Sequence, residues 1–315
     1  MALTKVSPEI LDLNNTAGTS NVRLGVNAGN SIVSGGNYNV VVGDEAGTAI
    51  TTGDYNTFMG YQAGDATTVG LYNVAIGGAS LSTNILGSKS VAVGTSALFV
   101  QNYATATDAF NTAVGHEAGA AVTTGVQNTL IGGLAGDALT TGVQNVAIGY
   151  NALSTEDGHG GNVAVGVSAL STLNAGADAY NTAVGHVAGA AVTTATNNTL
   201  IGAYAGDALT TSSANVAVGV RALSGETKGT NNVAIGRDAL AVQNSTSALV
   251  SANTAVGALA GAAVTTGVNN TLIGGLAGDA ITTGYQGVMV GYDAGGASTT
   301  GQNNVLVGYS AGAEI

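Results

Sequence analysis

The chain has 315 residues, of which 50 are glycine, one is proline and none is cysteine or tryptophan. Its formal net charge of −12 and its six lysines and arginines argue against a nucleic-acid partner and against binding to anionic membranes. Without cysteine, disulfides and thiolate metal sites are excluded. Hydrophobic residues make up 45% and aromatic residues 4%, which indicates narrow, repetitive cores and not a globule built around large side chains.

Residues 1–20 precede the repeats and contain the single proline, Pro8. We expect them to form an N-terminal attachment segment. They contain no long apolar run of the kind found in signal peptides. The chain has no stretch of eighteen apolar residues, so no membrane insertion is predicted.

A repeat with a usual period of 17 residues occupies residues 21–315. Its seventeen units begin at residues 21, 39, 56, 73, 90, 111, 128, 145, 162, 181, 198, 215, 232, 253, 270, 287 and 304. This period is too short for a helical hairpin repeat and is typical of one coil of a solenoid. We therefore predict an all-β fold, a parallel β-solenoid of about 17 coils.

Each unit opens with a short run such as TAVG, TLIG or VAIG. The second and fourth positions point to one face of the predicted strand and the third position to the other. Both faces are apolar. We expect one face to fill the coil and the other to meet another chain, most simply in a side-by-side homotrimer.

Two further positions are nearly constant. The first position is asparagine in most units, and stacked asparagines can hydrogen-bond as a ladder. The fifth position is always glycine, as a turn with positive φ requires. We interpret both as parts of the coil with no direct role in binding. The predicted structural ladder includes Asn111, Asn128, Asn145, Asn162, Gly115, Gly132, Gly149 and Gly166.

A slower period groups the coils into blocks of four that start near residues 39, 111, 181 and 253. The fourth coil of the first three blocks carries extra residues, and insertions in solenoids often bind partners. The candidate receptor contacts in or beside these insertions are Phe99, Tyr103, Phe110, Tyr180 and Asn244. The alternative is that such residues cover the apolar flank or contact a neighbouring chain.

No catalytic constellation or cofactor site is predicted. His116 and His186 share the sixth position of equivalent coils, but the third copy has Ala258, so exposed turn residues are favoured over a metal site. A single aspartate recurs once per block, and we expect a turn or capping role rather than calcium binding. These aspartates are Asp65, Asp137, Asp207 and Asp279.

The runs NVAIGYNAL (from Asn145), NVAVGVSAL (from Asn162) and NVAIGRDAL (from Asn232) resemble the head repeats of trimeric autotransporter adhesins of the YadA type. That resemblance implies a left-handed parallel β-roll with three chains side by side. The polar start MALTKVSPEILDL followed directly by repeats is more similar to bacteriophage tail-fibre and virion-fibre proteins.

The resemblance implies a structural fibre protein of a virion, assembled in the host cytoplasm, that extends toward or contacts the host surface. Its expected partners are further copies of itself, other virion proteins at residues 1–20 and at the open C-terminal coil, and a host glycan or protein. The alternatives are a bacterial adhesin of the trimeric autotransporter type, a polysaccharide-cleaving β-helix enzyme, and an ice-binding solenoid with threonine rows.

Overall fold

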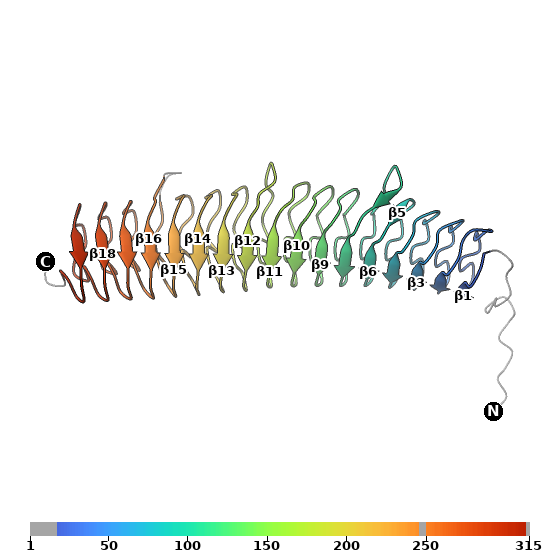
Figure 1. Ribbon diagram of the computed structural model, residues 1–315, viewed down its shortest axis with the longest axis horizontal. Coiled ribbons are helices and arrows are strands. Elements are labelled where there is room, and N and C mark those ends of the chain that lie inside the picture. The colour runs from blue at the N-terminus through green and yellow to red at the C-terminus, as the bar shows by residue number, and fades with distance from the viewer. Residues whose placement is uncertain (1–17, 246–249, 313–315) are drawn as a thin grey trace, which may run out of the picture. The chain divides into compact units, whose positions relative to one another are not determined.

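The computed structural model describes residues 18–245 and 250–312. These residues form strands and turns and contain no helix. The chain divides into two units, Met1–Gly158 and His159–Ile315, and each is a parallel β-solenoid in which one short strand per turn stacks on the next (Figure 1). The predicted attachment segment, residues 1–20, lies almost entirely outside the described residues.

The strands of the first unit are β1 (Val22–Leu24), β2 (Val40–Val42), β3 (Thr57–Met59), β4 (Val74–Ile76), β5 (Gly87–Ser88), β6 (Val91–Val93), β7 (Thr107–Asp108), β8 (Thr112–Val114), β9 (Thr129–Ile131) and β10 (Val146–Ile148). Those of the second unit are β11 (Val163–Val165), β12 (Thr182–Val184), β13 (Thr199–Ile201), β14 (Val216–Val218), β15 (Val233–Ile235), β16 (Thr254–Val256), β17 (Thr271–Ile273), β18 (Val288–Val290) and β19 (Val305–Val307).

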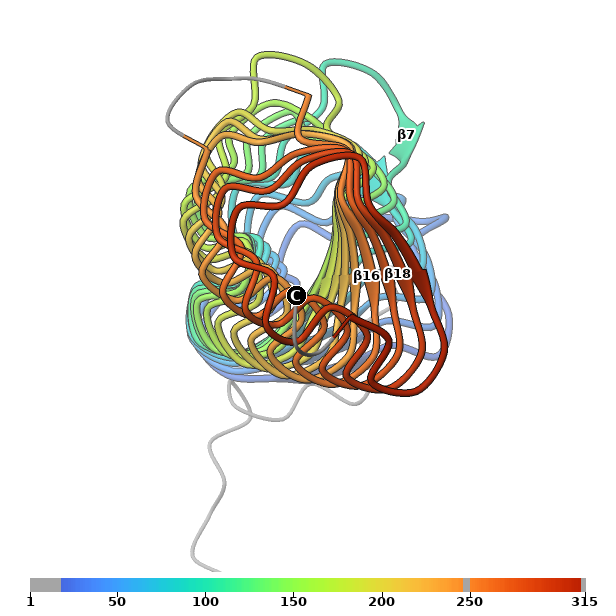
Figure 2. The same ribbon diagram turned by 90° about the vertical axis from the view of Figure 1, so that its left-hand side faces the viewer.

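Apart from β5 and β7, which pair with each other beside an insertion, every strand occupies positions two to four of its repeat. Equivalent positions pair on successive turns, as Thr112 does with Thr129 and Ala113 with Leu130. The predicted β-solenoid of about 17 turns and 17-residue period is therefore confirmed. Figure 2 shows the strands along one side of the coil and the insertion that carries β7 projecting beyond the outline of the neighbouring turns.

The third position of the repeat, which is the middle residue of each strand, points into the coil. Ala113, Leu130 and Ala147 are completely buried, as the strand alternation requires. The eighth position adds a second inward row of alanines, of which Ala118 and Ala135 are examples. Because these side chains are small, the core is narrow, which accounts for a composition rich in alanine and valine and poor in aromatics.

The four-coil blocks reflect how this core is filled. Where the third position is a leucine, as at Leu130, the ninth position nearby is a glycine, Gly119 or Gly136. Where the third position is alanine, as at Ala147, the ninth position of that coil can be the buried Leu153. Large side chains thus enter the core from two different rows, and a glycine or alanine faces them, which avoids overfilling a close-packed core.

The fifth-position glycine is required for two reasons. Gly115 has φ +141°, a region that side-chain-bearing residues rarely adopt. A Cβ atom there would also collide with the carbonyl of Gly132 on the next turn. The glycines of this row therefore set how closely successive turns approach.

The first-position asparagines form a buried ladder within each unit. The backbone N–H of Asn128 donates to Oδ1 of Asn111 (2.9 Å), and the side-chain amide of Asn128 donates to the carbonyl of Gly142 (2.9 Å). Asn145 repeats the backbone bond with Asn128 (2.9 Å), and in the second unit Asn181 does so with Asn162 (3.1 Å). Each side chain thus satisfies buried polar groups on two turns.

Candidate interaction surface

In each unit the outward side of the strands carries aliphatic and threonine side chains, and we call this side the strand face. It consists of the second and fourth positions of each turn, which are valine, threonine, isoleucine, leucine or methionine throughout β1–β4, β6 and β8–β19. Ile131, Ile201 and Ile273 expose 37%, 40% and 40% of their surface. Exposed aliphatic side chains aligned in this way within a unit are typical of an interaction site.

A second row of exposed side chains lies immediately before the first position of each turn. In the first unit it contains Tyr38, Tyr55 and Tyr72, whose rings stack with centroids 4.9 and 5.0 Å apart. Farther along this row the ammonium of Lys89 lies 5.1 Å from the ring centroid of Phe110. The same ammonium pairs with Asp108 at 2.6 Å. We call this set the aromatic row.

The three tyrosines are not among the residues predicted to contact a receptor. Their spacing of 17 residues, in the same position of three consecutive units, was the available signal. Stacking on adjacent turns follows from that spacing, because parallel strands lie about 4.8 Å apart.

The candidate receptor contacts do not all reach the surface. Phe99, Phe110, Tyr180 and Asn244 are exposed. Phe110 and Tyr180 occupy the position immediately before the first position of a turn. Phe110 therefore belongs to the aromatic row, and Tyr180 has the equivalent position in the second unit. Tyr103, in contrast, is only 6% exposed.

The hydroxyl of Tyr103 donates to the carbonyl of Gly125 (2.8 Å) and accepts from the amide of Asn111 (3.3 Å). Burial raises the pKa of this phenol, against the smaller effect of the bond from Asn111. The ring therefore anchors the first insertion to the core, and we leave it out of the proposed contact set.

The third insertion is held by a buried carboxylate, Glu226. Its Oε1 accepts from the backbone N–H groups of Thr227, Lys228 and Gly229 at 2.7–2.9 Å. Its Oε2 accepts from Nε2 of Gln243 (2.8 Å) and from the hydroxyl of Ser245 (3.0 Å). This arrangement connects residue 226 to the start of the insertion; residues 246–249 lie outside the described part of the chain.

Burial alone would raise the pKa of Glu226, but the hydrogen bonds from Gly229, Lys228, Gln243 and Ser245 outweigh it and lower the pKa overall. The charged form is therefore stabilised in the folded protein. The role of Glu226 is to position the insertion.

The recurring aspartates cap turns incompletely. Asp137 accepts hydrogen bonds from its own backbone N–H and from that of Ala138. Its Oδ1 is buried and has no hydrogen-bond partner, and the same holds for Asp65, Asp207 and Asp279. Burial raises the pKa of all four carboxyl groups.

The threonine pairs are partly used within the coil. The hydroxyl of Thr123 donates to the carbonyl of Thr140 (3.1 Å), and that of Thr265 donates to the carbonyl of Thr282 (3.1 Å). At least one hydroxyl of each pair is therefore already bonded to the next turn, and in the pair Thr140–Thr141 both are.

Comparison with models of known protein families, with curated proteins and with solved structures finds no match to this chain. Among the residues that the structure describes, no helix is present that is long and apolar enough to cross a bilayer. The interpretation of function therefore depends on the surfaces described above.

Proposed function

We propose that the protein is a structural fibre subunit of a virion, in which three copies lie side by side with their strand faces directed toward a common axis. The observation that carries the proposal is the strand face itself, a partly exposed surface of aliphatic and threonine side chains that contains no charged residue. In water such a surface favours association, because burying apolar area releases about 25 cal/mol per Å².

The size of the strand face supports this assembly. Three residues span about 10 Å and each turn adds about 4.8 Å. Seventeen turns therefore present about 800 Å² per chain, an area comparable to one side of a stable interface. Closed rotational symmetry lets identical faces satisfy one another without leaving one open.

In the proposed fibre the solenoid has the left-handed β-roll form. The narrow core and repetitive turns serve length, and contact with the host surface falls to exposed residues of the insertions, Phe99, Phe110, Tyr180 and Asn244. The same architecture also supports the alternative of a bacterial adhesin of the trimeric autotransporter type, since both functions need an extended trimer.

Two measurements test the proposal. Native mass spectrometry should give a species of three times the chain mass of 30.3 kDa. Mass spectrometry of purified virions from the system that encodes the chain should find it among the particle proteins. A trimer found on cell envelopes and not in virions would instead favour the adhesin, and a stable monomer would contradict both.

A further inference from the structure

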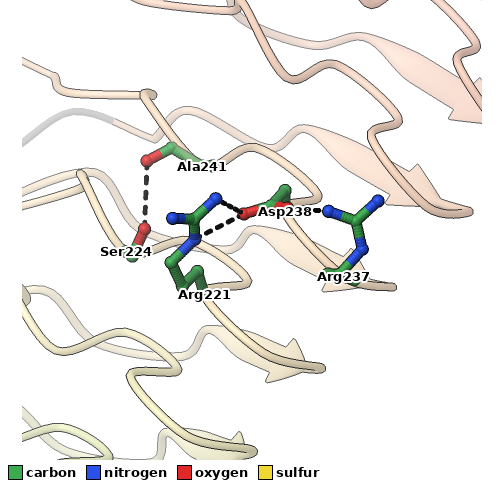
Figure 3. Close-up of polar contacts among 5 residues, drawn as sticks. All are labelled: Arg221, Ser224, Arg237, Asp238 and Ala241. Carbon is green, nitrogen blue, oxygen red and sulfur yellow. Dashed lines mark hydrogen bonds and ion pairs between the residues drawn. The ribbon is translucent and has the colours of Figure 1, made fainter.

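In the second unit, two arginines on successive turns share one buried carboxylate (Figure 3). Oδ1 of Asp238 accepts from Nε of Arg221 at 2.6 Å, and Oδ2 accepts from Nη1 of Arg237 at 2.6 Å. The side chain of Asp238 is 5% exposed, whereas those of Arg221 and Arg237 are 60% and 59% exposed. We call these three residues the basic corner.

The basic corner is rigidly positioned. Asp238 occupies the left-handed turn after β15, with φ 58°, and its backbone N–H donates to the carbonyl of Val220 on the preceding turn (3.0 Å). The backbone N–H of Arg221 likewise donates to the carbonyl of Ala203 on the turn before it (3.0 Å). With the backbone fixed and the guanidinium groups oriented by the shared carboxylate, little conformational entropy remains to be lost on binding a ligand.

The arginines have donors to spare. A guanidinium carries five N–H groups, and Asp238 engages Nε and Nη2 of Arg221 and Nη1 of Arg237. The remaining N–H groups belong to side chains that are more than half exposed. Figure 3 shows the two guanidinium groups flanking the carboxylate from opposite sides.

The charge of the basic corner is opposite to that of the chain. Two guanidinium groups and one carboxylate leave a local excess of one positive charge, in a chain whose net charge is −12. A buried carboxylate needs one cation to neutralise it, so charge compensation does not by itself account for two arginines at one acid.

The turn before Arg221 places an aromatic ring beside the basic corner, and the neighbouring turns carry no acidic residue at the positions that Arg221 and Arg237 occupy. Tyr204 lies on the turn before Arg221 and is 41% exposed. Its ring packs edge-on against His186, with centroids 5.3 Å apart. On the other side, Leu259 donates its backbone N–H to the carbonyl of Arg237 (2.9 Å).

We propose that the basic corner binds the carboxylate or sulfate of an acidic sugar chain. Guanidinium groups bind such oxyanions through paired, charge-assisted hydrogen bonds. The ring of Tyr204 offers the apolar side of a sugar a surface with a polar tip. The proposal rests on the proposed function, because it supplies a ligand class for host contact.

The test is calorimetric titration of the full chain with a sulfated oligosaccharide, a polygalacturonate oligomer, a neutral dextran oligomer and inorganic sulfate. The variant R221Q/D238N/R237Q removes both cations without leaving a buried, unpaired carboxylate. The variant R221K/R237K keeps both positive charges but removes the paired N–H donors of the guanidinium groups. It tests the same site if the triple variant does not fold. The matched control is H116Q/E117Q, which removes an exposed histidine–glutamate pair at the same turn positions in the first unit.

We expect the native chain to bind the sulfated or the carboxylated oligomer and not the dextran. Binding should weaken about tenfold or more in the triple variant, the scale of a charge-assisted hydrogen bond, and also fall in the lysine variant. The control should bind like the native chain. The sulfated and carboxylated arms identify which oxyanion is preferred.

Equal binding by the triple variant and the native chain, equal binding of dextran, binding of sulfate alone as tightly as of either oligomer, or no binding of any acidic sugar would overturn the proposal. A native chain that is trimeric but binds no acidic sugar would refute the basic corner while leaving the fibre intact. A monomer that binds acidic sugar at Arg221 and Arg237 would support the basic corner and contradict the trimeric fibre.

Discussion

Gly119 and Leu130 share one site in the core: a Cβ atom on Gly119 would lie 2.6 Å from Cδ1 of Leu130. Gly119 also has φ +59°, in the left-handed region. The glycine at this position is therefore fixed both by its backbone and by the leucine on the next turn.

Gly119→Ala should lower the free energy of unfolding by about 1–3 kcal/mol, because overpacking a filled core forces neighbours to move. Urea denaturation measures the change. The matched control is Gly133→Ala, since a Cβ atom on Gly133 meets nothing closer than 3.6 Å and its φ is not positive. A control as damaging as Gly119→Ala would show that the loss comes from glycine content and not from the contact with Leu130.

Asn128→Ala should destabilise the first unit by about 1–3 kcal/mol, since it leaves the N–H of Asn145 and the carbonyl of Gly142 buried without their partner. The control is Gln127→Ala, one residue earlier in the chain, where the side chain is exposed. It removes a polar side chain of a length similar to that of Asn128 and should change stability by no more than about 0.5 kcal/mol. Hydrogen exchange at Asn145 gives a local readout, and unchanged protection there would contradict the ladder.

Glu226→Gln tests the carboxylate that holds the third insertion. The pKa of Glu226 is lower in the folded chain than its usual value of 4.5, so the charged group adds stability above about pH 4.5 that is lost as the pH falls through the folded pKa. The native chain should therefore be more stable than the variant by about 1–3 kcal/mol at pH 7, with the difference narrowing as the pH falls below the usual glutamate pKa of 4.5.

Thermal unfolding between pH 3 and 7 measures this gap. Glu117→Gln, at a side chain that is 44% exposed, is the control and should show a much smaller difference at pH 7. A gap for Glu226→Gln that stayed constant over the whole range would mean that its charge is not the stabilising feature.

The sequence predicts the coil because the coil is local and repeated. Every turn restates the same inward third position, glycine turn and asparagine, so the period and register follow from spacing alone. The Gly–Leu alternation was visible as a four-coil block, but its cause was not, because Gly119 and Leu130 meet only when successive turns are stacked.

The surfaces are less predictable from the sequence. Tyr103 and Phe110 belong to the same insertion, yet one is buried and the other exposed, and their spacing does not distinguish them. The side-chain partners of Glu226, Gln243 and Ser245, lie on the following turn, so their contact with Glu226 cannot be predicted from neighbouring residues in the sequence. The pairing of Arg221 with Asp238 could have been found from their separation of one period.

Disruption of the strand face should separate assembly from folding. Ile131→Lys combined with Ile201→Lys places charges on the exposed face without touching the core, so each chain should fold but should not assemble. Thr124→Lys combined with Thr211→Lys adds the same charge at exposed turn positions and should leave the assembly intact. Light scattering after size-exclusion chromatography measures both, and circular dichroism confirms that the strands remain.

The most direct test of the central claim is the mass of the native chain in solution, measured by native mass spectrometry at micromolar concentration. A strand face that packs against two other copies predicts a single species of three chains, each of 30.3 kDa, which dissociates in the Ile131→Lys/Ile201→Lys variant. A folded monomer at that concentration, or a trimer that the variant leaves intact, would contradict the account.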